Sequence, residues 1–176
     1  MKNRDFALLA GLFVIWVLQP VFIIGQIPPA YYNAAGGLSG DDLKTALHNI
    51  IDDHTALSYS AVTDALKVTD EDTLNSSNVI LLYTGWSYPK SSFGNGSDDW
   101  NREHVWSKAH GSFGDVPPEG TDLHHLRPTD ASVNSAKQAR DFSKGIVEYL
   151  DPSGPTGCFM DTDIWEPRPE VKGDVA

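Results

Sequence analysis

Apolar residues recur at intervals of three and four positions across residues 41–59. The positions are Leu43, Ala46, Leu47, Ile50, Ile51 and Leu57. This spacing places them on one side of a helix, so an amphipathic helix is predicted over 41–59, with Ser39 or Asp41 as its cap. A second, shorter helix is predicted over residues 62–68. The acidic residues 70–72 that follow are interpreted as a solvated loop, with Ca²⁺ binding as the alternative.

Short runs rich in β-branched and aromatic residues predict strands farther along the chain. Residues 78–84 stop at a glycine and predict a buried strand, and residues 100–106 and 123–126 predict two more. Segments 87–99 and 111–120 are rich in Gly, Ser, Asn, Asp or Pro and are predicted to be loops. Thr129 or Asp130 can cap a helix over residues 131–142. Helices and strands are mixed without an internal repeat, which predicts an α+β fold.

The C-terminal part of the chain has weaker patterning. Residues 151–157 are rich in turn formers, and the residues beyond them show no regular period. The final residues, V-K-G-D-V-A, read as the start of a helix. The chain is therefore expected to stop inside an element and to be incomplete at its C-terminus.

The first 25 residues have the order of an export signal. Lys2 and Arg4 precede an apolar run over residues 6–18. An acidic residue before the run and a Gln-Pro pair after it favour a cleaved signal ending at Gly25 over a retained membrane anchor. The chain is therefore predicted to be secreted or periplasmic, with one domain over residues 26–176 and no stable membrane association.

Charge is unevenly distributed along the chain. The net charge is −11, yet residues 101–145 contain six Lys or Arg and six Asp or Glu and are neutral. An acidic protein is not a passive coat for nucleic acid, but a neutral site that holds a divalent cation can still attract phosphate. The single cysteine, Cys158, allows no internal disulfide and is interpreted as a small buried hydrophobe.

The neutral segment also contains the candidate chemistry. Glu103 and His104 are adjacent, His124 and His125 form a second pair, and Asn134 lies on the predicted helix. Carboxylate and amide oxygens are the ligands that Mg²⁺ and Ca²⁺ prefer, and a neutral imidazole can take a proton from water. This combination is what metal-assisted phosphodiester hydrolysis needs.

Several separated motifs in one order resemble the bacterial endonuclease I family of secreted or periplasmic nucleases. They are Y-Y-N-A-A-G-G-L-S-G, D-D-H-T-A-L-S-Y-S, L-L-Y-T-G-W, N-R-E-H-V-W, T-D-L-H-H-L-R-P, V-N-S and E-P-R-P-E-V-K-G-D-V-A, and they extend over about residues 31–176. The resemblance implies a ββα-metal (His-Me finger) nuclease core with additional helices. It also implies that His104 is the general base and that Glu103 and Asn134 hold one divalent ion, Mg²⁺ with Ca²⁺ or Mn²⁺ as alternatives.

Other residues of the segment are candidates for supporting roles. Arg127 is expected to act beside His104 as a phosphate clamp, because its planar guanidinium suits phosphate oxygens. Asp122 is a candidate for orienting a histidine from behind, with an ordinary strand-entry residue as the alternative. His124 and His125 should point to opposite faces of their predicted strand, so that at most one reaches the site directly. Arg102 and Lys137 complete the set of substrate or supporting candidates.

The candidate site has one geometric conflict and several departures from the family pattern. Neighbours on a regular strand face opposite sides, so a bulge, strand end or loop is expected at Glu103 and His104. The chain also departs from the family pattern, which usually has Pro and Ser at Ser107 and Ala109, and Arg and Asn at Lys137 and Ala139. These changes affect the expected phosphate contacts and leave the reacting residues in place.

The tryptophans Trp86, Trp100 and Trp106 are interpreted as core or site walls, with base stacking as the alternative.

The predicted function is that of a secreted, monomeric endonuclease with little sequence preference, cutting DNA and, as a second substrate, RNA, to give 5′-phosphate products. One alternative is an inactive or truncated nucleic-acid-binding domain of the same fold. A zinc hydrolase built on His104, His124 and His125 is a second, although no H-E-x-x-H helix and no cysteine ligand set is present. A membrane-anchored structural protein that retains residues 1–25 is the third.

Overall fold

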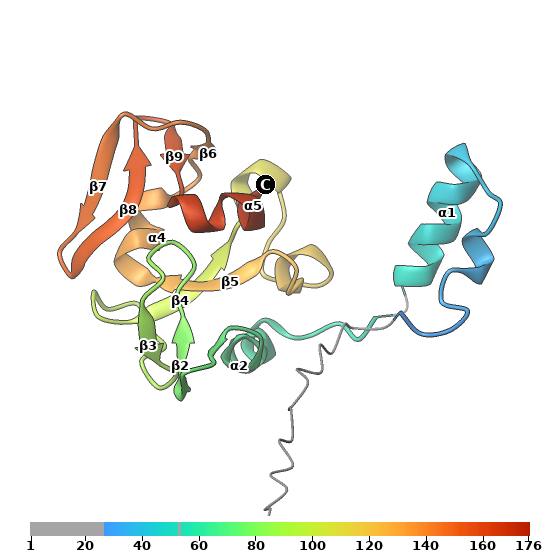
Figure 1. Cartoon of the computed structure of the whole chain (residues 1–176), viewed down its shortest axis with the longest axis horizontal. Coiled ribbons are helices and arrows are strands. Elements are labelled where there is room, and N and C mark those ends of the chain that lie inside the picture. The colour runs from blue at the N-terminus through green and yellow to red at the C-terminus, as the bar shows by residue number, and fades with distance from the viewer. Residues whose placement is uncertain (1–26, 53) are drawn as a thin grey trace, which may run out of the picture. The chain divides into compact units, whose positions relative to one another are not determined.

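The computed structural model describes residues 27–52 and 54–176 (Figure 1). The predicted export signal lies outside these residues. The chain divides into two compact units, Met1–Asp53 and His54–Ala176. None of the helices in the described part has the length and apolar composition needed to span a membrane.

The described part of the first unit is a short 3₁₀ helix, η1 (Asn33–Ala35), and helix α1 (Gly40–Ile51). Asp41 and Asp42 lie in the first turn of α1, where the helix dipole favours negative charge, and Ser39 is the N-cap residue without a side-chain hydrogen bond. None of its residues is buried. The single helix predicted over residues 41–59 is wrong in extent, because α1 ends at Ile51.

The second unit begins with helix α2 (Tyr59–Thr69), which confirms the second predicted helix. The Ser58 side chain accepts a hydrogen bond from the Ala61 amide at 3.2 Å and fixes where α2 starts. Helix α1 ends with Asp52 as its C-cap, where the Asp52 amide donates to the His48 carbonyl oxygen at 2.9 Å. The apolar side of α2 packs Val62 and Leu66 against Leu126.

A three-stranded antiparallel sheet follows, in the order β1–β2–β3. Its strands are β1 (Glu71–Asp72), β2 (Asn75–Ile80) and β3 (Ser87–Pro89). The interpretation of residues 70–72 as a solvated loop is wrong. Asp70 and Asp72 are buried, and the Asp72 carboxylate accepts hydrogen bonds from the Ser87 hydroxyl at 2.5 Å and from the Leu74 amide at 2.8 Å.

The central element is a strand–strand–helix unit. Strand β4 (Trp100–His104) pairs antiparallel with β5 (Leu126–Asp130), and helix α4 (Ala131–Lys137) follows directly. The Asp130 carboxylate accepts hydrogen bonds from the amides of Ser132 and Val133, as expected of the predicted cap. The helix is shorter than predicted because the chain turns at Gln138, whose φ is +50°.

The loop between β4 and β5 carries two short helices, α3 (Lys108–Gly111) and the 3₁₀ helix η2 (Glu119–Thr121). The third predicted strand exists as β5 but begins at Leu126, so its predicted opening over residues 123–126 is placed three residues too early. The two histidines of that segment lie in a turn.

The C-terminal region forms a four-stranded sheet in the order β6–β9–β8–β7, which the sequence patterning did not predict. Its strands are β6 (Asp141–Phe142), β7 (Val147–Asp151), β8 (Gly154–Met160) and β9 (Ile164–Glu166). These strands show no regular alternation of apolar and polar residues. The reason is that β7 exposes Val147 and Leu150, while β8 contains two glycines and a proline. The 3₁₀ helix η3 (Pro169–Val171) and helix α5 (Lys172–Val175) complete the unit, and α5 confirms the helix start predicted there.

The main hydrophobic core lies between this sheet and the strand–strand–helix unit (Figure 1). It contains Val133 from α4, Cys158 from β8 and Trp165 from β9, all fully buried. Cys158 is therefore the buried hydrophobe that was predicted. The core fixes α4 against β4, and this packing positions the candidate site. The fold is α+β, as predicted.

Candidate active site

Glu103 and His104 are the last two residues of β4, and both are buried. The pairing with β5 is regular as far as His104, with Glu103 opposite Arg127 and His104 opposite Leu126. Of the three distortions expected there, the structure has the strand end and no bulge. Because side chains alternate along a strand, the two residues have different neighbours.

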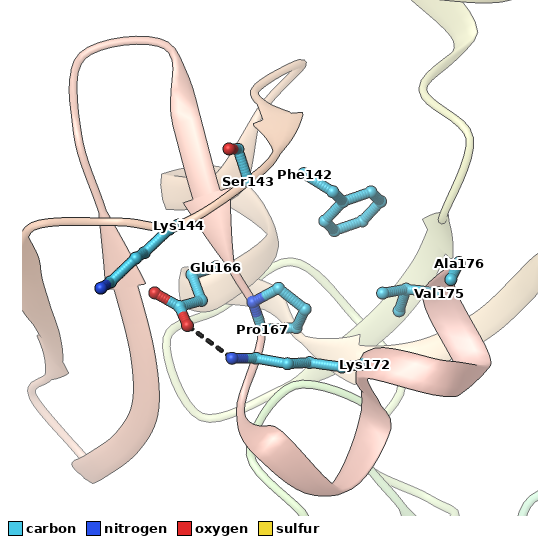
Figure 2. Close-up of a pocket in the computed structure, with 8 residues that line it drawn as sticks. All are labelled: Phe142, Ser143, Lys144, Glu166, Pro167, Lys172, Val175 and Ala176. Carbon is cyan, nitrogen blue, oxygen red and sulfur yellow. Dashed lines mark hydrogen bonds and ion pairs between the residues drawn. The ribbon is translucent and has the colours of Figure 1, made fainter.

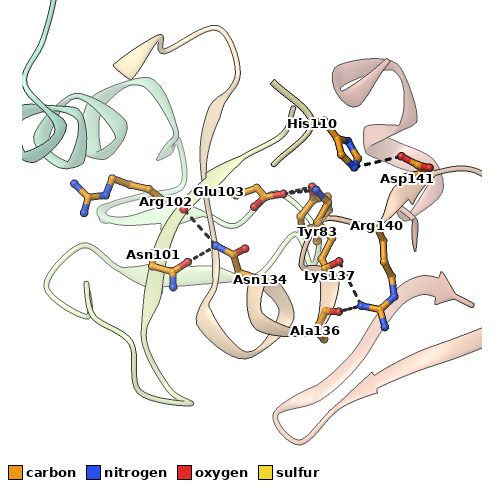
Figure 3. A network of polar contacts seen from close by, with 10 residues as sticks. All are labelled: Tyr83, Asn101, Arg102, Glu103, His110, Asn134, Ala136, Lys137, Arg140 and Asp141. Carbon is orange, nitrogen blue, oxygen red and sulfur yellow. Dashed lines mark hydrogen bonds and ion pairs between the residues drawn. The ribbon is translucent and has the colours of Figure 1, made fainter. Parts of the chain in front are cut away.

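The Glu103 carboxylate is held in a closed polar network (Figure 3). Its Oε1 accepts a hydrogen bond from the Tyr83 hydroxyl at 2.7 Å and lies 3.0 Å from Lys137 Nζ. Burial raises the pKa of the Glu103 carboxyl, and Lys137 and Tyr83 act in the opposite direction. The pKa of the Tyr83 hydroxyl is raised well above its ordinary value, by burial and by the neighbouring Glu103.

Lys137 is the cation of this network and is 1% exposed. It lies on the last turn of α4, and its ammonium is 4.8 Å from the centre of the Phe142 ring. The structure therefore places Lys137 against the predicted ligand Glu103, in the position of a counter-ion. A fully buried lysine is rare unless it is paired, and here Glu103 provides the pair.

Asn134 lies one turn earlier on α4 and reaches back to β4. Its Nδ2 donates to Asn101 Oδ1 at 2.7 Å and to the Arg102 carbonyl oxygen at 3.3 Å (Figure 3). Both contacts use the amide nitrogen, so the amide oxygen Oδ1 remains available as a ligand. The structure thus brings Asn134 to the β4 backbone beside Glu103.

His104 is oriented by the β4–β5 loop. Its Nε2 lies 3.1 Å from the Gly120 carbonyl oxygen, which can only accept a hydrogen bond. Nε2 therefore carries the hydrogen, and in the neutral ring Nδ1 holds the lone pair. Burial lowers the pKa of His104, with the Gly120 contact acting against this, so the neutral ring persists below its ordinary pKa. The ring stacks on Tyr59, with 5.9 Å between the ring centres.

The second histidine pair is divided between two environments. The His124 side chain is 95% exposed, and its Nδ1 lies 2.7 Å from Asp122 Oδ1. His125 Nε2 lies 2.8 Å from the Glu119 carbonyl oxygen, and its ring centre is 5.5 Å from that of His104. His125 is thus the histidine that reaches the site, while Asp122 orients the exposed His124. Among the described residues His125 Nδ1 is buried without a hydrogen-bond partner.

The two arginines predicted to meet substrate have partners within the protein. Arg127 Nε donates to Asp70 Oδ1 at 2.7 Å, an ion pair in which the aspartate side chain is 5% exposed. The Arg102 guanidinium lies 3.5 Å from the centre of the Tyr59 ring and donates to the Tyr59 carbonyl oxygen. The phosphate-clamp role of Arg127 stays a prediction, and the geometry assigns its Nε to the anchoring of α2.

The donor set suits a hard divalent cation. Among residues 27–52 and 54–176, no group of three or more His, Cys, Asp or Glu is arranged to hold a metal ion. The exposed His124 points to Asp122. Mg²⁺ is commonly bound through one or two carboxylates together with water and substrate phosphate. One carboxylate, on Glu103, and the amide oxygen of Asn134 fit that requirement.

Two concavities lie near these residues. A cleft of about 680 Å³ is lined by residues that include His125 and Lys137, and so adjoins the Glu103 network. A separate pocket of about 380 Å³ lies between Phe142 and α5 and is crossed by the Glu166–Lys172 ion pair at 2.5 Å (Figure 2). This second pocket contains none of the predicted site residues.

Sequence reasoning missed Tyr83 and Tyr59, which contact Glu103 and His104. Both belong to apolar runs that were interpreted only as secondary structure. Their contacts join positions distant in the chain, so no local pattern could have indicated them.

Comparisons with known proteins give one family. A family model described as endonuclease I matches residues 39–176. The chain is 59% identical over 146 residues to an extracellular ribonuclease of Bacillus amyloliquefaciens, covering 83% of this chain and 50% of that protein. It is 56% identical over 146 residues to an extracellular ribonuclease of Bacillus subtilis (strain 168), with the same coverage. The chain thus spans about half the length of these relatives. No solved structure gave a significant match.

Proposed function

The chain belongs to the endonuclease I family, and on that premise we propose that it is a secreted nuclease that hydrolyses phosphodiester bonds, in RNA first and also in DNA. The relatives support secretion and RNA as a substrate, because they are named extracellular ribonucleases. They change the expected order of substrates, which the sequence motifs gave as DNA before RNA. The β4–β5–α4 order supports a ββα-metal core, with Glu103 and Asn134 as the residues that would hold the cation.

The observation that carries the proposal is the orientation of His104. Because Gly120 fixes the hydrogen on Nε2, the lone pair of Nδ1 can accept a proton from water. Burial lowers the pKa of this ring, which keeps it neutral and able to act as a base at neutral pH. Phe113 and His125 surround the ring and limit its movement.

The reaction follows from these roles. His104 Nδ1 takes a proton from a water molecule while the water oxygen forms a bond to phosphorus. The bond from phosphorus to the 3′ oxygen breaks, and that oxygen takes a proton from solvent, leaving 5′-phosphate and 3′-hydroxyl ends. When bound, a divalent cation supplies charge neutralisation at the phosphate and at the leaving oxygen. Since the nucleophile is water, a 2′-hydroxyl is not required, and both RNA and DNA can be cut.

Little sequence preference is expected of this site. The proposed groups act on the phosphate and on water, and contacts to phosphate carry no sequence information directly.

The test is cleavage of end-labelled RNA and DNA by the purified chain with Mg²⁺, with EDTA, and as His104→Ala. We expect EDTA to stop cleavage and His104→Ala to lower kcat by about 100- to 10,000-fold, the usual contribution of a general base. The matched control is His48→Ala, which removes an exposed histidine of α1 outside the candidate site and should cut at the wild-type rate. Product ends should be 5′-phosphate and 3′-hydroxyl.

Two results would contradict the proposal. His104→Ala cutting at the wild-type rate would remove His104 as the base. A folded wild-type chain that cuts neither substrate with Mg²⁺, Mn²⁺ or Ca²⁺ would favour the inactive nucleic-acid-binding domain.

A further inference from the structure

The 680 Å³ cleft next to the Glu103 network has a composition unlike that of the acidic chain around it. Its walls include Trp106, His110, His125, Lys137 and Arg140. Its volume lies within the range of small-ligand sites, about 300–1,000 Å³. Asp141 and Asp174 also line it, and Asp141 Oδ1 lies 3.6 Å from His110 Nε2. Lys137 and Arg140 balance Asp141 and Asp174, so these groups leave the cleft without net charge in a protein whose net charge is −11.

Trp106 is the unusual member of this set. Trp100 and Trp165 are fully buried, whereas Trp106 is 59% exposed and follows the proposed base by two positions. Its ring meets the His110 ring at an interplanar angle of 71°, with 5.7 Å between the ring centres. Its indole therefore presents an aromatic face to solvent beside the cleft.

Arg140 is held in position beside the last turn of α4. Its guanidinium donates to the carbonyl oxygen of Ala136, and its Nε donates to the carbonyl oxygen of Asp161 at 3.0 Å. Figure 3 shows Arg140, His110 and Asp141 near Lys137, which in turn contacts Glu103. The cleft therefore brings a fixed guanidinium and an exposed indole to the edge of the proposed catalytic site.

We propose that this cleft is a nucleotide subsite for single-stranded nucleic acid, in which a base next to the cleaved phosphate stacks on Trp106. The proposal rests on the proposed nuclease function and names the form of its substrate. Every base has a flat aromatic face, so stacking on tryptophan tolerates any sequence. Bases in a duplex are already stacked and paired, so only an unpaired base can reach a side chain within a cleft. The Arg140 guanidinium supplies positive charge for the neighbouring phosphate.

The experiment compares cleavage of one oligonucleotide sequence as a single strand and as a duplex, using wild type, Trp106→Ala and Trp106→Phe. We expect Trp106→Ala to lower kcat/KM on the single strand by about 5- to 100-fold, the range for loss of one stacked base. Trp106→Phe should recover most of the loss because it keeps an aromatic face. Cleavage of the duplex should be slower than that of the single strand and insensitive to both substitutions. The matched control is Trp86→Ala, which removes a partly buried tryptophan outside the cleft.

A binding measurement in EDTA separates failure of this proposal from failure of the nuclease function. Fluorescence anisotropy with a labelled single-stranded oligonucleotide should show weaker binding by Trp106→Ala than by wild type or Trp106→Phe, even if no preparation cuts. Wild-type binding and wild-type kcat/KM in Trp106→Ala would overturn the subsite and leave the nuclease proposal standing. Equal losses on single strand and duplex, with an unchanged Tm, would overturn the preference for single strands.

Discussion

Two neighbouring regions at the end of β4 differ in how they are built. Glu103 belongs to a region closed by Tyr83 and Lys137, next to the main hydrophobic core. His104 belongs to a region made by the β4–β5 loop and the start of α2, where its partners are a backbone carbonyl and the Tyr59 ring. One strand end thus presents both a carboxylate fixed next to the core and an imidazole oriented by a loop. Substitution of Glu103 should therefore lower the free energy of unfolding, whereas substitution of His104 should lower mainly the activity.

His125 connects the two regions. Its ring centre lies 5.5 Å from that of His104, and it lines the same cleft as Lys137, the partner of Glu103. It belongs to the loop by sequence and is held by the Glu119 carbonyl oxygen.

The largest effect on stability is expected from breaking the Glu103–Lys137 pair. Glu103→Gln leaves the 1% exposed Lys137 without its counter-ion, so the free energy of unfolding should fall by about 3–5 kcal/mol. Chemical denaturation in EDTA measures this without any contribution from a bound cation. The double variant Glu103→Gln, Lys137→Met removes both charges and should recover part of the loss. Equal stability of wild type and Glu103→Gln would show that the two regions do not differ as described.

A smaller loss is expected at Arg127, which tests whether this residue supports the fold or the substrate. Arg127→Ala leaves the buried Asp70 carboxylate without its ion pair, and the free energy of unfolding should fall by about 1.5–3 kcal/mol. The matched control is Lys67→Ala, which removes a surface pair with the 82% exposed Asp64 and should cost less than about 1 kcal/mol. A large fall in kcat with unchanged stability would instead restore the phosphate-clamp role.

The smallest effects separate the two adjacent histidines. His124→Ala should change the free energy of unfolding by less than about 0.5 kcal/mol, because the side chain is 95% exposed. His125→Ala removes the contact with the Glu119 carbonyl oxygen and should cost about 1 kcal/mol. Thermal unfolding of the two variants side by side measures the difference. The reverse order would mean that the loop is held differently.

The local features of this protein could be predicted from its sequence. Spacing of apolar positions indicated α2 and the start of α1, and Asp130 was one of the two candidate caps of α4, because capping depends on residues two or three positions apart. The separated motifs identified the family and singled out Glu103, His104 and Asn134. Alternation of side chains predicted a bulge, strand end or loop at Glu103 and His104, and the structure has the strand end. All of these depend on neighbours in the chain, which a single sequence contains.

Contacts between segments that are distant in the chain could be seen only in the tertiary structure. The β6–β9 sheet has no clear alternation because its strands are short, irregular and partly exposed, and pairing between them defines it. No local pattern indicates that Tyr83 donates to Glu103, that Arg127 pairs with Asp70, or that His125 turns inward while His124 turns out. Likewise, Trp100 and Trp106 are the same residue type in the same short apolar run. Only packing makes Trp100 a core residue and leaves Trp106 exposed at the cleft. Burial and pairing of polar groups are set by the whole fold, because each depends on which remote segment occupies the adjoining space.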